Sequence, residues 1–496
     1  MKNNFKNAKY NAIGFIFPVA VSLFTTPYIV HKLNTEIYGI YVLAISLMGM
    51  LSFLDLGFGQ GIIKFVSHYE AKKDFKKINE IVNTSLLINI VMGLVGGLVI
   101  FSFSDFLSRK VFKVKPDQIE LAIISFKIVS IGFVLNLISS IFSNIPRALQ
   151  RYDISVKIQN TVWFLSAISS VIILYLGYGL VEMLRFYVIF KFLGLISYFW
   201  FSKKIIPELK LSLEFNKDVF KEIFSFNIFT AINSITGNIV FMVDKMIIAY
   251  FLGTSAVTYY QIPFTISQMA NGFVSSVIQH LFPTVSSLNS IGDRDKLKHI
   301  YIKTTRYVIA FSLIVFFGLV LFGKPFLKIW IGKGISEISY PLLVIISLVF
   351  FFSSISSVGY YYYNGLGLSK VNMISSFVGA IAYIIFAIVL IPAFNLKGAA
   401  FSFISILLPY PVYVYILNKV ISFSQFEYLK MLVKSLIIIV ITLVLNFVSS
   451  FIFMYDTIVY VVVNVVIFGL VNSLVYLLRI LDFEEVKNII NRGLNK

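Results

Sequence analysis

The sequence predicts an all-α polytopic membrane protein with about fourteen transmembrane helices. Hydrophobic residues make up 58% of its 496 residues and charged residues only 13%, which is far from the composition of soluble globular domains. Apolar runs such as residues 435–454 are long enough to cross the hydrocarbon core of a bilayer, which takes about 20 residues. These runs are about twice as long as barrel strands, and backbone groups in lipid need internal partners, so we expect helices.

Polar breaks divide the apolar sequence into fourteen candidate spans. The connections between them are short, so they leave no room for a soluble catalytic domain, and no G-x-x-x-x-G-K-[ST] phosphate loop is present. The candidate spans cover residues 10–30, 38–63, 80–103, 118–143, 155–176, 180–201, 219–251, 256–283, 301–323, 338–363, 370–391, 397–417, 429–452 and 457–479.

The net charge of +19 reflects membrane topology rather than nucleic-acid binding. With the N-terminus in the cytoplasm, most Lys and Arg residues fall in cytoplasmic connections, as the positive-inside rule requires. The basic start, MKNNFKNAKY, runs into an apolar stretch without an A-x-A cleavage site, so we expect it to remain as part of the first span. Both termini are therefore expected in the cytoplasm, and no nucleic-acid partner is expected.

Enzymatic chemistry is not indicated. The chain has no cysteine and only four scattered histidines, and it lacks an H-E-x-x-H or paired-carboxylate motif. We expect no cofactor, no metal site and no catalytic residues.

The longest polar connection lies between the sixth and seventh spans and predicts two lobes. We expect an N-terminal lobe over residues 1–205, a cytoplasmic linker over 206–218 and a C-terminal lobe over 219–418, with helices 13 and 14 and a cytoplasmic tail over 419–496. Six spans in each lobe predict parallel repeats.

Polar stripes on the seventh and eighth spans predict a shared cavity. At 100° per residue, the polar residues of the seventh span fall within about 20° of one line and those of the eighth within about 40°. The alternative is hydrogen bonding between packed helices, which uses the same residue types. The predicted cavity-lining residues are Asn227, Ser234, Asn238, Gln261, Gln268 and Gln279.

Charged residues inside spans are candidates for substrate binding, because each costs about 2.5 to 3.5 kcal/mol at a helix centre. Lys127 and Lys191 lie near the middle of their spans and are predicted to bind an anionic group; snorkelling or pairing with a carboxylate is the alternative. Arg185, three residues after Glu182, and Lys245 are further candidates.

Two carboxylates inside spans are candidates for coupling to a proton or sodium ion. Asp55 lies in LDLGFGQG, whose glycines allow close helix packing or a helix break, and Asp244 adjoins Lys245. The alternative for each is a structural ion pair. The run Tyr360–Tyr363 is predicted to belong to an aromatic belt at the membrane interface.

Several motifs along the chain resemble the polysaccharide transporter branch of the MOP flippase superfamily, especially Wzx-type O-antigen flippases. They are TTPYIVHKLNTEIYGIYVL (25–43), LDLGFGQG (54–61), MVDKMIIAYFLG (242–253), NGLGLSKVN (364–372) and LIPAFNLKGAAFS (390–402). The resemblance implies two six-helix lobes in a V around a central cationic cavity, followed here by two C-terminal helices.

The resemblance also implies the activity: movement of undecaprenyl-pyrophosphate-linked oligosaccharide repeat units, such as O-antigen for lipopolysaccharide, from the cytoplasmic to the periplasmic leaflet by alternating access. The location would be the bacterial inner membrane. Implied partners are the lipid-linked substrate, membrane lipids, H⁺ or Na⁺ as a coupling ion, and a polysaccharide polymerase with its chain-length regulator. Lys127 and Lys191 become candidate phosphate ligands.

Other readings remain open at this stage. Fourteen spans match lipid II-type flippases of the same superfamily, whereas a cation-coupled drug exporter would favour acidic cavity residues over the basic ones present here. A membrane-embedded glycosyltransferase or polymerase would be expected to carry a sizeable catalytic loop, and a scaffold without transport activity is a further alternative.

Overall fold

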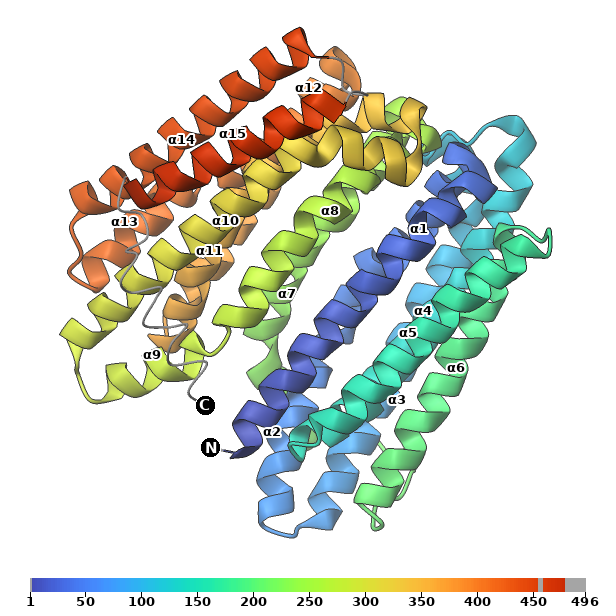
Figure 1. Cartoon of the computed structure of the whole chain (residues 1–496). Helices are drawn as coiled ribbons and strands as arrows, with labels where there is room; N and C mark the ends of the chain where they lie inside the picture. Colours follow the sequence, from blue (N-terminus) through green and yellow to red (C-terminus); the bar gives the residue numbers. More distant parts are fainter. Residues whose placement is uncertain (1, 454–457, 478–496) are drawn as a thin grey trace. The chain divides into compact units, whose positions relative to one another are not determined.

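The computed structural model describes the backbone of residues 2–453 and 458–477. Within these ranges, the side chains of residues 2–13, 15, 52, 226–241, 458 and 476–477 lie outside the description. All regular elements of the described residues are helices (Figure 1). The chain divides into two compact units, Met1–Thr258 (unit 1) and Tyr259–Lys496 (unit 2).

Unit 1 is built from long helices joined by short turns. They are α1 (Lys2–Met50), η1 (Leu51–Asp55), α2 (Phe58–Ala71), α3 (Phe75–Phe106), η2 (Leu107–Val111), η3 (Pro116–Gln118), α4 (Ile119–Ala148), α5 (Tyr152–Tyr175), α6 (Leu180–Ile205) and α7 (Lys217–Leu252). The α8 helix (Thr254–Ile278) begins in unit 1 and continues in unit 2.

Unit 2 is also built from long helices joined by short turns. Its remaining helices are α9 (Leu281–Ser290), α10 (Arg294–Ile331), α11 (Lys333–Gly365), α12 (Ser369–Ile404), η4 (Ser405–Leu407), α13 (Tyr410–Val420), α14 (Gln425–Ile452) and α15 (Ile458–Leu477).

Every predicted span falls on a helical segment, which confirms the all-α fold class and is consistent with fourteen spans. Within the described residues, eight helices are long and apolar enough to cross a membrane by length and composition alone. The α6, α7 and α8 helices are not among these eight. They are long, but each also carries polar or charged residues, such as Glu182, Arg185 and Lys191 in α6.

The first two predicted spans meet inside α1, at a kink centred on Asn34. This residue has a φ of 63°, and its side-chain oxygen accepts hydrogen bonds of 3.0 Å from the backbone N–H groups of Glu36 and Ile37. That is the geometry of a helix N-cap, so Asn34 ends one helix and starts the next. Glu36 pairs with Lys115 from the α3–α4 connection, and this hydrogen bond raises the pKa of the Lys115 ammonium.

The second predicted span is interrupted just after Asp55. Leu56 and Gly57 both have positive φ, 48° and 74°, which ends η1 and redirects the chain into α2. Glycine adopts this backbone without a steric penalty, so LDLGFGQG is a built helix break rather than continuous helix.

In unit 1, α3 and α4 pack closely at glycine residues. A Cβ added at Gly97 of α3 would lie 2.8 Å from Cγ2 of Val134 in α4, and one at Gly96 would lie 2.4 Å from Cε1 of Phe133. Small residues therefore allow α3 and α4 to approach closely, which is the usual way helices associate in lipid.

The predicted linker over 206–218 lies along α3 and is fixed to it by side-chain amides. Asn83 donates to the carbonyl oxygen of Lys210 at 2.9 Å and accepts from the N–H of Ser212 at 3.1 Å. Asn79 accepts from the N–H of Lys210 at 2.7 Å. The compact units divide later, at Thr258–Tyr259, with α7 in unit 1. The predicted lobe boundary at 206–218 stays a prediction.

Buried tyrosines form hydrogen bonds between helices in the core of unit 2. Tyr362 and Tyr363 are fully buried, and their hydroxyls donate to the carbonyl oxygens of Leu297 and Tyr413. The predicted aromatic belt is therefore wrong for these two residues, because they pack inside the helix bundle; Tyr360 is 47% exposed.

Candidate functional site

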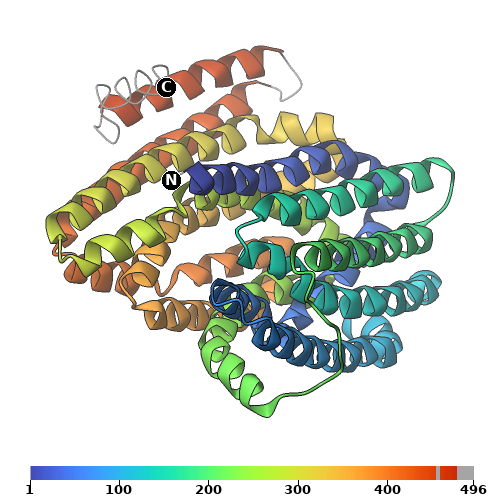
Figure 2. The same ribbon diagram turned by 90° about the horizontal axis from the view of Figure 1, so that it is seen from below.

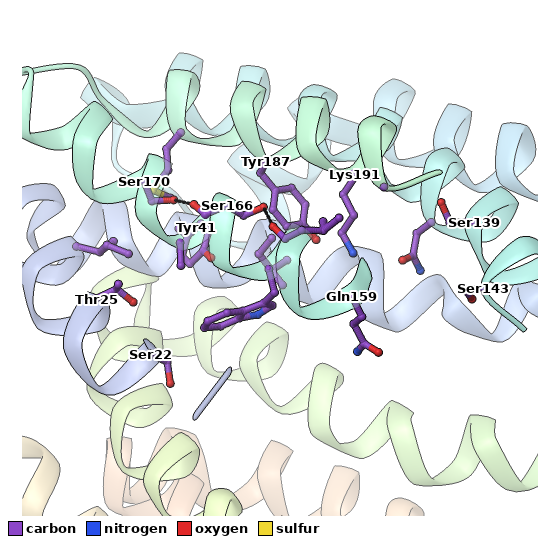
Figure 3. A pocket seen from close by; sticks show the side chains of 18 of the residues that line it. Ser22, Thr25, Tyr41, Ser139, Ser143, Gln159, Ser166, Ser170, Tyr187 and Lys191 are labelled. Carbon is purple, nitrogen blue, oxygen red and sulfur yellow. Dashed lines mark hydrogen bonds between the residues drawn. The ribbon is translucent and has the colours of Figure 1, made fainter. Parts of the chain in front are cut away.

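Unit 1 contains a polar cavity of about 480 Å³. Four helices of unit 1 supply its walls, and Figure 3 shows ten of the lining residues by name. The polar and aromatic lining residues are Ser22, Thr25, Thr26, Tyr38, Tyr41, Asn136, Ser139, Ser140, Ser143, Arg147, Gln159, Trp163, Ser166, Ser170, Tyr187, Lys191 and Tyr198.

Helical periodicity brings these side chains to one face of each helix. The α4 wall uses positions 136, 139, 140, 143 and 147, and the α5 wall uses 159, 163, 166 and 170. Residues three and four apart lie on the same side of a helix. The sequence therefore forms continuous polar stripes on α4 and α5, and both stripes face the cavity.

The serine hydroxyls are largely satisfied by their own helices. Ser143 donates to the Ser140 carbonyl at 3.1 Å and Ser166 to the Val162 carbonyl at 2.8 Å. Ser170 donates to the Ser166 carbonyl at 2.7 Å (Figure 3). A hydroxyl that donates in this way keeps lone pairs available to accept a further bond. The cavity wall can therefore accept hydrogen bonds from the hydroxyl groups of a bound molecule.

Two cations face the cavity, and none of its described lining residues is a carboxylate. The Lys191 ammonium lies 5.5 Å from the centroid of the Tyr187 ring, one turn away on α6. The Arg147 guanidinium donates to the Gln159 oxygen at 3.3 Å. Because neither cation is neutralised by a carboxylate in the cavity lining, the cavity favours an anion.

Aromatic rings form a second part of the wall. Tyr38 and Tyr41 lie next to each other with centroids 5.7 Å apart, and Trp163 and Tyr187 line the same cavity. Rings of this kind offer apolar faces alongside polar edges. The cavity thus combines cations, hydroxyl groups and flat apolar surfaces.

Asp55 lies behind the cavity wall at the break between η1 and α2. Its Oδ1 accepts hydrogen bonds of 2.9 Å from the Asn89 amide and from the Ser140 hydroxyl. Ser140 lines the cavity, so one hydroxyl separates Asp55 from the cavity. Asn89 is fully buried and also donates to the Leu137 carbonyl at 3.0 Å, which fixes the orientation of its amide.

The predicted cavity cations have separate locations. Lys191 lines the cavity, whereas Lys127 is not among the lining residues: its ammonium lies 5.0 Å from the centroid of the Phe101 ring on α3. Arg185 points away from the cavity as well, with a largely exposed side chain that donates to Glu182 at 3.3 Å. Lys127 and Lys191 lie at similar positions along their predicted spans. Lys191 faces the cavity, whereas Lys127 lies beside Phe101 of α3.

Lys245 and Asp244 form a buried ion pair in unit 1. The Lys245 ammonium lies 3.0 Å from the Asp244 carboxylate, and the two side chains are 5% and 0% exposed. A buried cation of this kind is stabilised by its partner. The structural ion pair that was the alternative for Asp244 is therefore formed.

The predicted stripes on α7 and α8 have different outcomes. The side chains of Asn227, Ser234 and Asn238 lie outside the described residues. On α8, Gln261 donates to Thr265 at 2.7 Å within the same helix. Gln268 is exposed and Gln279 partly exposed.

Further along the α8 stripe, the contacts run between helices. The Ser275 hydroxyl lies 3.4 Å from that of Ser357 in α11, and the Tyr361 hydroxyl donates to the Ser275 carbonyl at 3.3 Å. Hydrogen bonding between packed helices, the alternative reading, thus accounts for this part of the stripe.

Most residues of the unit 1 cavity were not predicted from the sequence. Arg147, Gln159 and Trp163 were not singled out, although the spacing of polar residues on α4 and α5 carried the same signal as that on α7 and α8. Arg147 lies four residues beyond its predicted span, 118–143, where a basic residue is expected for topology alone. Its place in the cavity wall became visible only from the structure.

A family model described as "Polysaccharide biosynthesis protein" matches residues 5–289, which is more than half of the chain. The chain belongs to this family. A second model, described as "MatE", matches residues 230–389. The cavity lies within the first of these regions.

The most informative curated relative is named "Putative O-antigen transporter" and comes from Shigella flexneri. It is 22% identical over 400 residues, covering 80% of this chain and 93% of the relative. The match extends over most of both chains.

Solved structures establish the fold as that of MOP superfamily transporters. The lipid II flippase MurJ in an inward closed conformation aligns with a TM-score of 0.73 at 16% identity, covering 98% of this chain and 99% of that one. A multidrug resistance MATE family transporter of the MOP superfamily aligns with a TM-score of 0.69 at 13% identity, covering 85% and 95%. The resemblance to the polysaccharide transporter branch is confirmed, and the chain is a multi-pass membrane protein.

Proposed function

We propose that this family member is a flippase for undecaprenyl-pyrophosphate-linked oligosaccharide repeat units of a surface polysaccharide such as O-antigen. It would act in the bacterial inner membrane with both termini in the cytoplasm, moving its substrate to the periplasmic leaflet by alternating access. The observation that carries the proposal is the unit 1 cavity, where Lys191 and Arg147 face hydroxyl-bearing and aromatic side chains without a carboxylate among the described lining residues.

Each part of the substrate matches a part of the cavity. The pyrophosphate carries the negative charge that Lys191 and Arg147 favour, and charge-assisted hydrogen bonds to phosphate are among the strongest in proteins. Sugar hydroxyls can donate to the serine oxygens, and sugar rings can stack on Trp163 and Tyr187. The hydrocarbon chain requires no polar partner and can remain in lipid.

The same charges favour a lipid-linked anion over a cationic drug. A cationic drug would be repelled by Lys191 and Arg147 and would need an acidic partner in the cavity. The second candidate function is therefore a flippase for another pyrophosphate-linked saccharide, of the lipid II type, to which the MurJ-like fold extends support. On this proposal the protein binds and moves its substrate without chemical conversion.

Coupling to an ion gradient is assigned to Asp55. Its carboxylate is one hydroxyl away from the cavity at a helix break, where a proton or Na⁺ bound to it can change the cavity wall through Ser140. Asp244 is held by Lys245 and is the weaker candidate. Partnership with a polymerase and a chain-length regulator belongs to this proposal as well.

Replacing Lys191 tests the proposal, with Lys127 as a matched control. Both are lysines inside predicted spans with ammonium groups near aromatic rings, at 5.5 and 5.0 Å, but only Lys191 lines the cavity. In a strain that lacks the native gene, Lys191→Gln should lower surface polysaccharide at least about tenfold, since a charge-assisted hydrogen bond contributes about 1.5 to 3 kcal/mol.

The Lys127→Gln variant should support normal surface polysaccharide in the same strain. Membrane levels of both variants are measured by immunoblotting, so that loss of protein is not mistaken for loss of transport. Normal surface polysaccharide from Lys191→Gln at normal protein level would refute the assignment of the cavity.

A further inference from the structure

A second cavity of about 460 Å³ lies between α5 and α6. The two helices lie side by side in both views (Figure 1 and Figure 2). We call this cavity the α5–α6 groove. Its lining residues are Arg151, Asp153, Ile154, Lys157, Ile158, Thr161, Val162, Leu165, Phe190, Leu193, Gly194, Ser197 and Phe201.

Most of the groove is apolar and open to the surroundings. Leu165 is 41% exposed and Leu193 is 48% exposed. On a membrane-spanning helix pair, such side chains meet hydrocarbon, so the groove can hold a hydrocarbon chain that enters from the bilayer. Along α5 it extends from residue 151 to residue 165, about 21 Å at 1.5 Å per residue.

One end of the groove is positively charged. Arg151, just before α5, donates two hydrogen bonds to Asp153, of 3.0 and 3.1 Å, and this pairing raises the pKa of the Arg151 guanidinium. Lys157, one turn further, is exposed. The three charges leave a net positive charge at the start of α5, which favours a phosphate at this end.

The groove and the polar cavity share a wall. Val162 and Gly194 line both, and a Cβ added at Gly194 would lie 2.7 Å from Cγ2 of Val162. The side chain of Val162 and the backbone at Gly194 therefore lie between the groove and the cavity that holds Lys191. Arg147, which lines the cavity, lies four residues before Arg151 across the α4–α5 turn, so each space has a basic residue beside this turn.

We propose that the α5–α6 groove is a docking site for the polyprenyl phosphate end of a lipid-linked substrate, with its chain along Leu165 and Leu193 and its phosphate at Lys157 and Arg151. This inference rests on the proposed function and adds the place where the substrate lipid is held before its saccharide enters the polar cavity.

Photo-crosslinking of the full-length protein tests the groove. The purified protein is placed in phosphatidylcholine nanodiscs with undecaprenyl phosphate that carries a diazirine on its chain, and labelled peptides are located by mass spectrometry. Label should concentrate on α5 and α6 residues of the groove. An excess of unlabelled undecaprenyl phosphate should displace it, whereas phosphatidylglycerol and inorganic phosphate should not.

Two matched variants of α6 distinguish the groove from the general lipid surface. Leu193→Trp fills the groove, and Ile196→Trp adds the same ring at a residue that is equally exposed, 47% against 48%, but does not line the groove. Labelling should fall about tenfold in Leu193→Trp, equivalent to lost burial of about two methylene groups, and stay unchanged in Ile196→Trp. Lys157→Gln should weaken capture of the phosphate-bearing probe but not of a diazirine polyprenol without phosphate.

Several outcomes would overturn the docking site: label spread over the lipid-facing helices, equal displacement by phosphatidylglycerol, or equal labelling of Leu193→Trp and Ile196→Trp. The probe carries no saccharide and reports binding rather than transport. Capture in the groove together with normal polysaccharide export by Lys191→Gln would therefore refute the proposed role of the cavity but not the docking site. No capture in the groove together with reduced export by Lys191→Gln would refute the docking site but not the role of the cavity.

Discussion

Asp55 is a carboxylate held by three donors at a point where the helix is broken. Asn89 and Ser140 donate to the same oxygen, and the backbone N–H of Gly59 bonds the carboxylate as well. Ionisable groups within membrane proteins commonly mark ion pathways. The amide of an asparagine at position 55 would keep one acceptor oxygen for these donors while removing the charge.

We predict that Asp55→Asn folds normally but loses its response to an ion gradient. Transport is measured in vesicles with an imposed H⁺ or Na⁺ gradient, and folding is checked by thermal unfolding in detergent. Asp105→Asn is the control, since Asp105 is exposed and pairs only locally with Arg109 in the described contacts. Gradient-driven transport by Asp55→Asn equal to that of the unchanged protein would exclude Asp55 as the coupling residue.

The sequence did not predict which way each charged side chain points from its helix. Lys127 and Lys191 have similar depth in their predicted spans, yet one lies over Phe101 and the other in the cavity. Depth follows from counting residues at 1.5 Å each, whereas direction depends on which neighbouring helix packs against each face. In an apolar helix with few polar residues, hydrophobicity does not distinguish these faces.

At the scale of elements, the sequence predicted helix positions well because membrane spans have long apolar runs. The glycines of LDLGFGQG left close helix packing or a helix break open, and the structure has the break. The kink at Asn34 falls in the predicted connection between the first two spans, but its capping by Asn34 was not predicted, although Asn followed by Glu two residues later is a helix-start pattern. The contacts of the segment 206–216 were harder to predict, because its polar composition is that of a free linker. Its backbone is instead bonded to Asn79, Asn83 and Thr84 of α3.

We predict that Asn83→Ala loosens this segment. Asn83 is 4% exposed and bonds the backbone of Lys210 and Ser212 through part-buried hydrogen bonds, each of which contributes about 0.5 to 1.5 kcal/mol. Limited trypsin digestion should cleave faster after Lys210, and the melting temperature should fall. Ser67→Ala, which removes a bond within one exposed helix turn, should change neither. Unchanged cleavage at Lys210 in Asn83→Ala would show that α3 does not fix the segment.

For the whole molecule, the proposed function accounts for basic residues inside the spans of a chain that is only 13% charged. A lysine in a membrane helix has a cost of about 2.5 to 3.5 kcal/mol, and under the proposed function a pyrophosphate-linked substrate would offset it on binding. The cavity in unit 1 is the place where such a substrate would meet Lys191 and Arg147. Its cations were predicted in part, through Lys191, and its hydroxyl and aromatic walls emerged from the packing of α1, α4, α5 and α6.

The most direct test of the account is translocation by the purified protein in liposomes. Lipid-linked oligosaccharide from the native host is placed in the inner leaflet, and its appearance outside is followed with a glycosidase that cannot cross the membrane. The account predicts release of saccharide much faster than in protein-free liposomes, and slow release with Lys191→Gln. Release at the protein-free rate with well-folded protein, under both H⁺ and Na⁺ gradients, would contradict it.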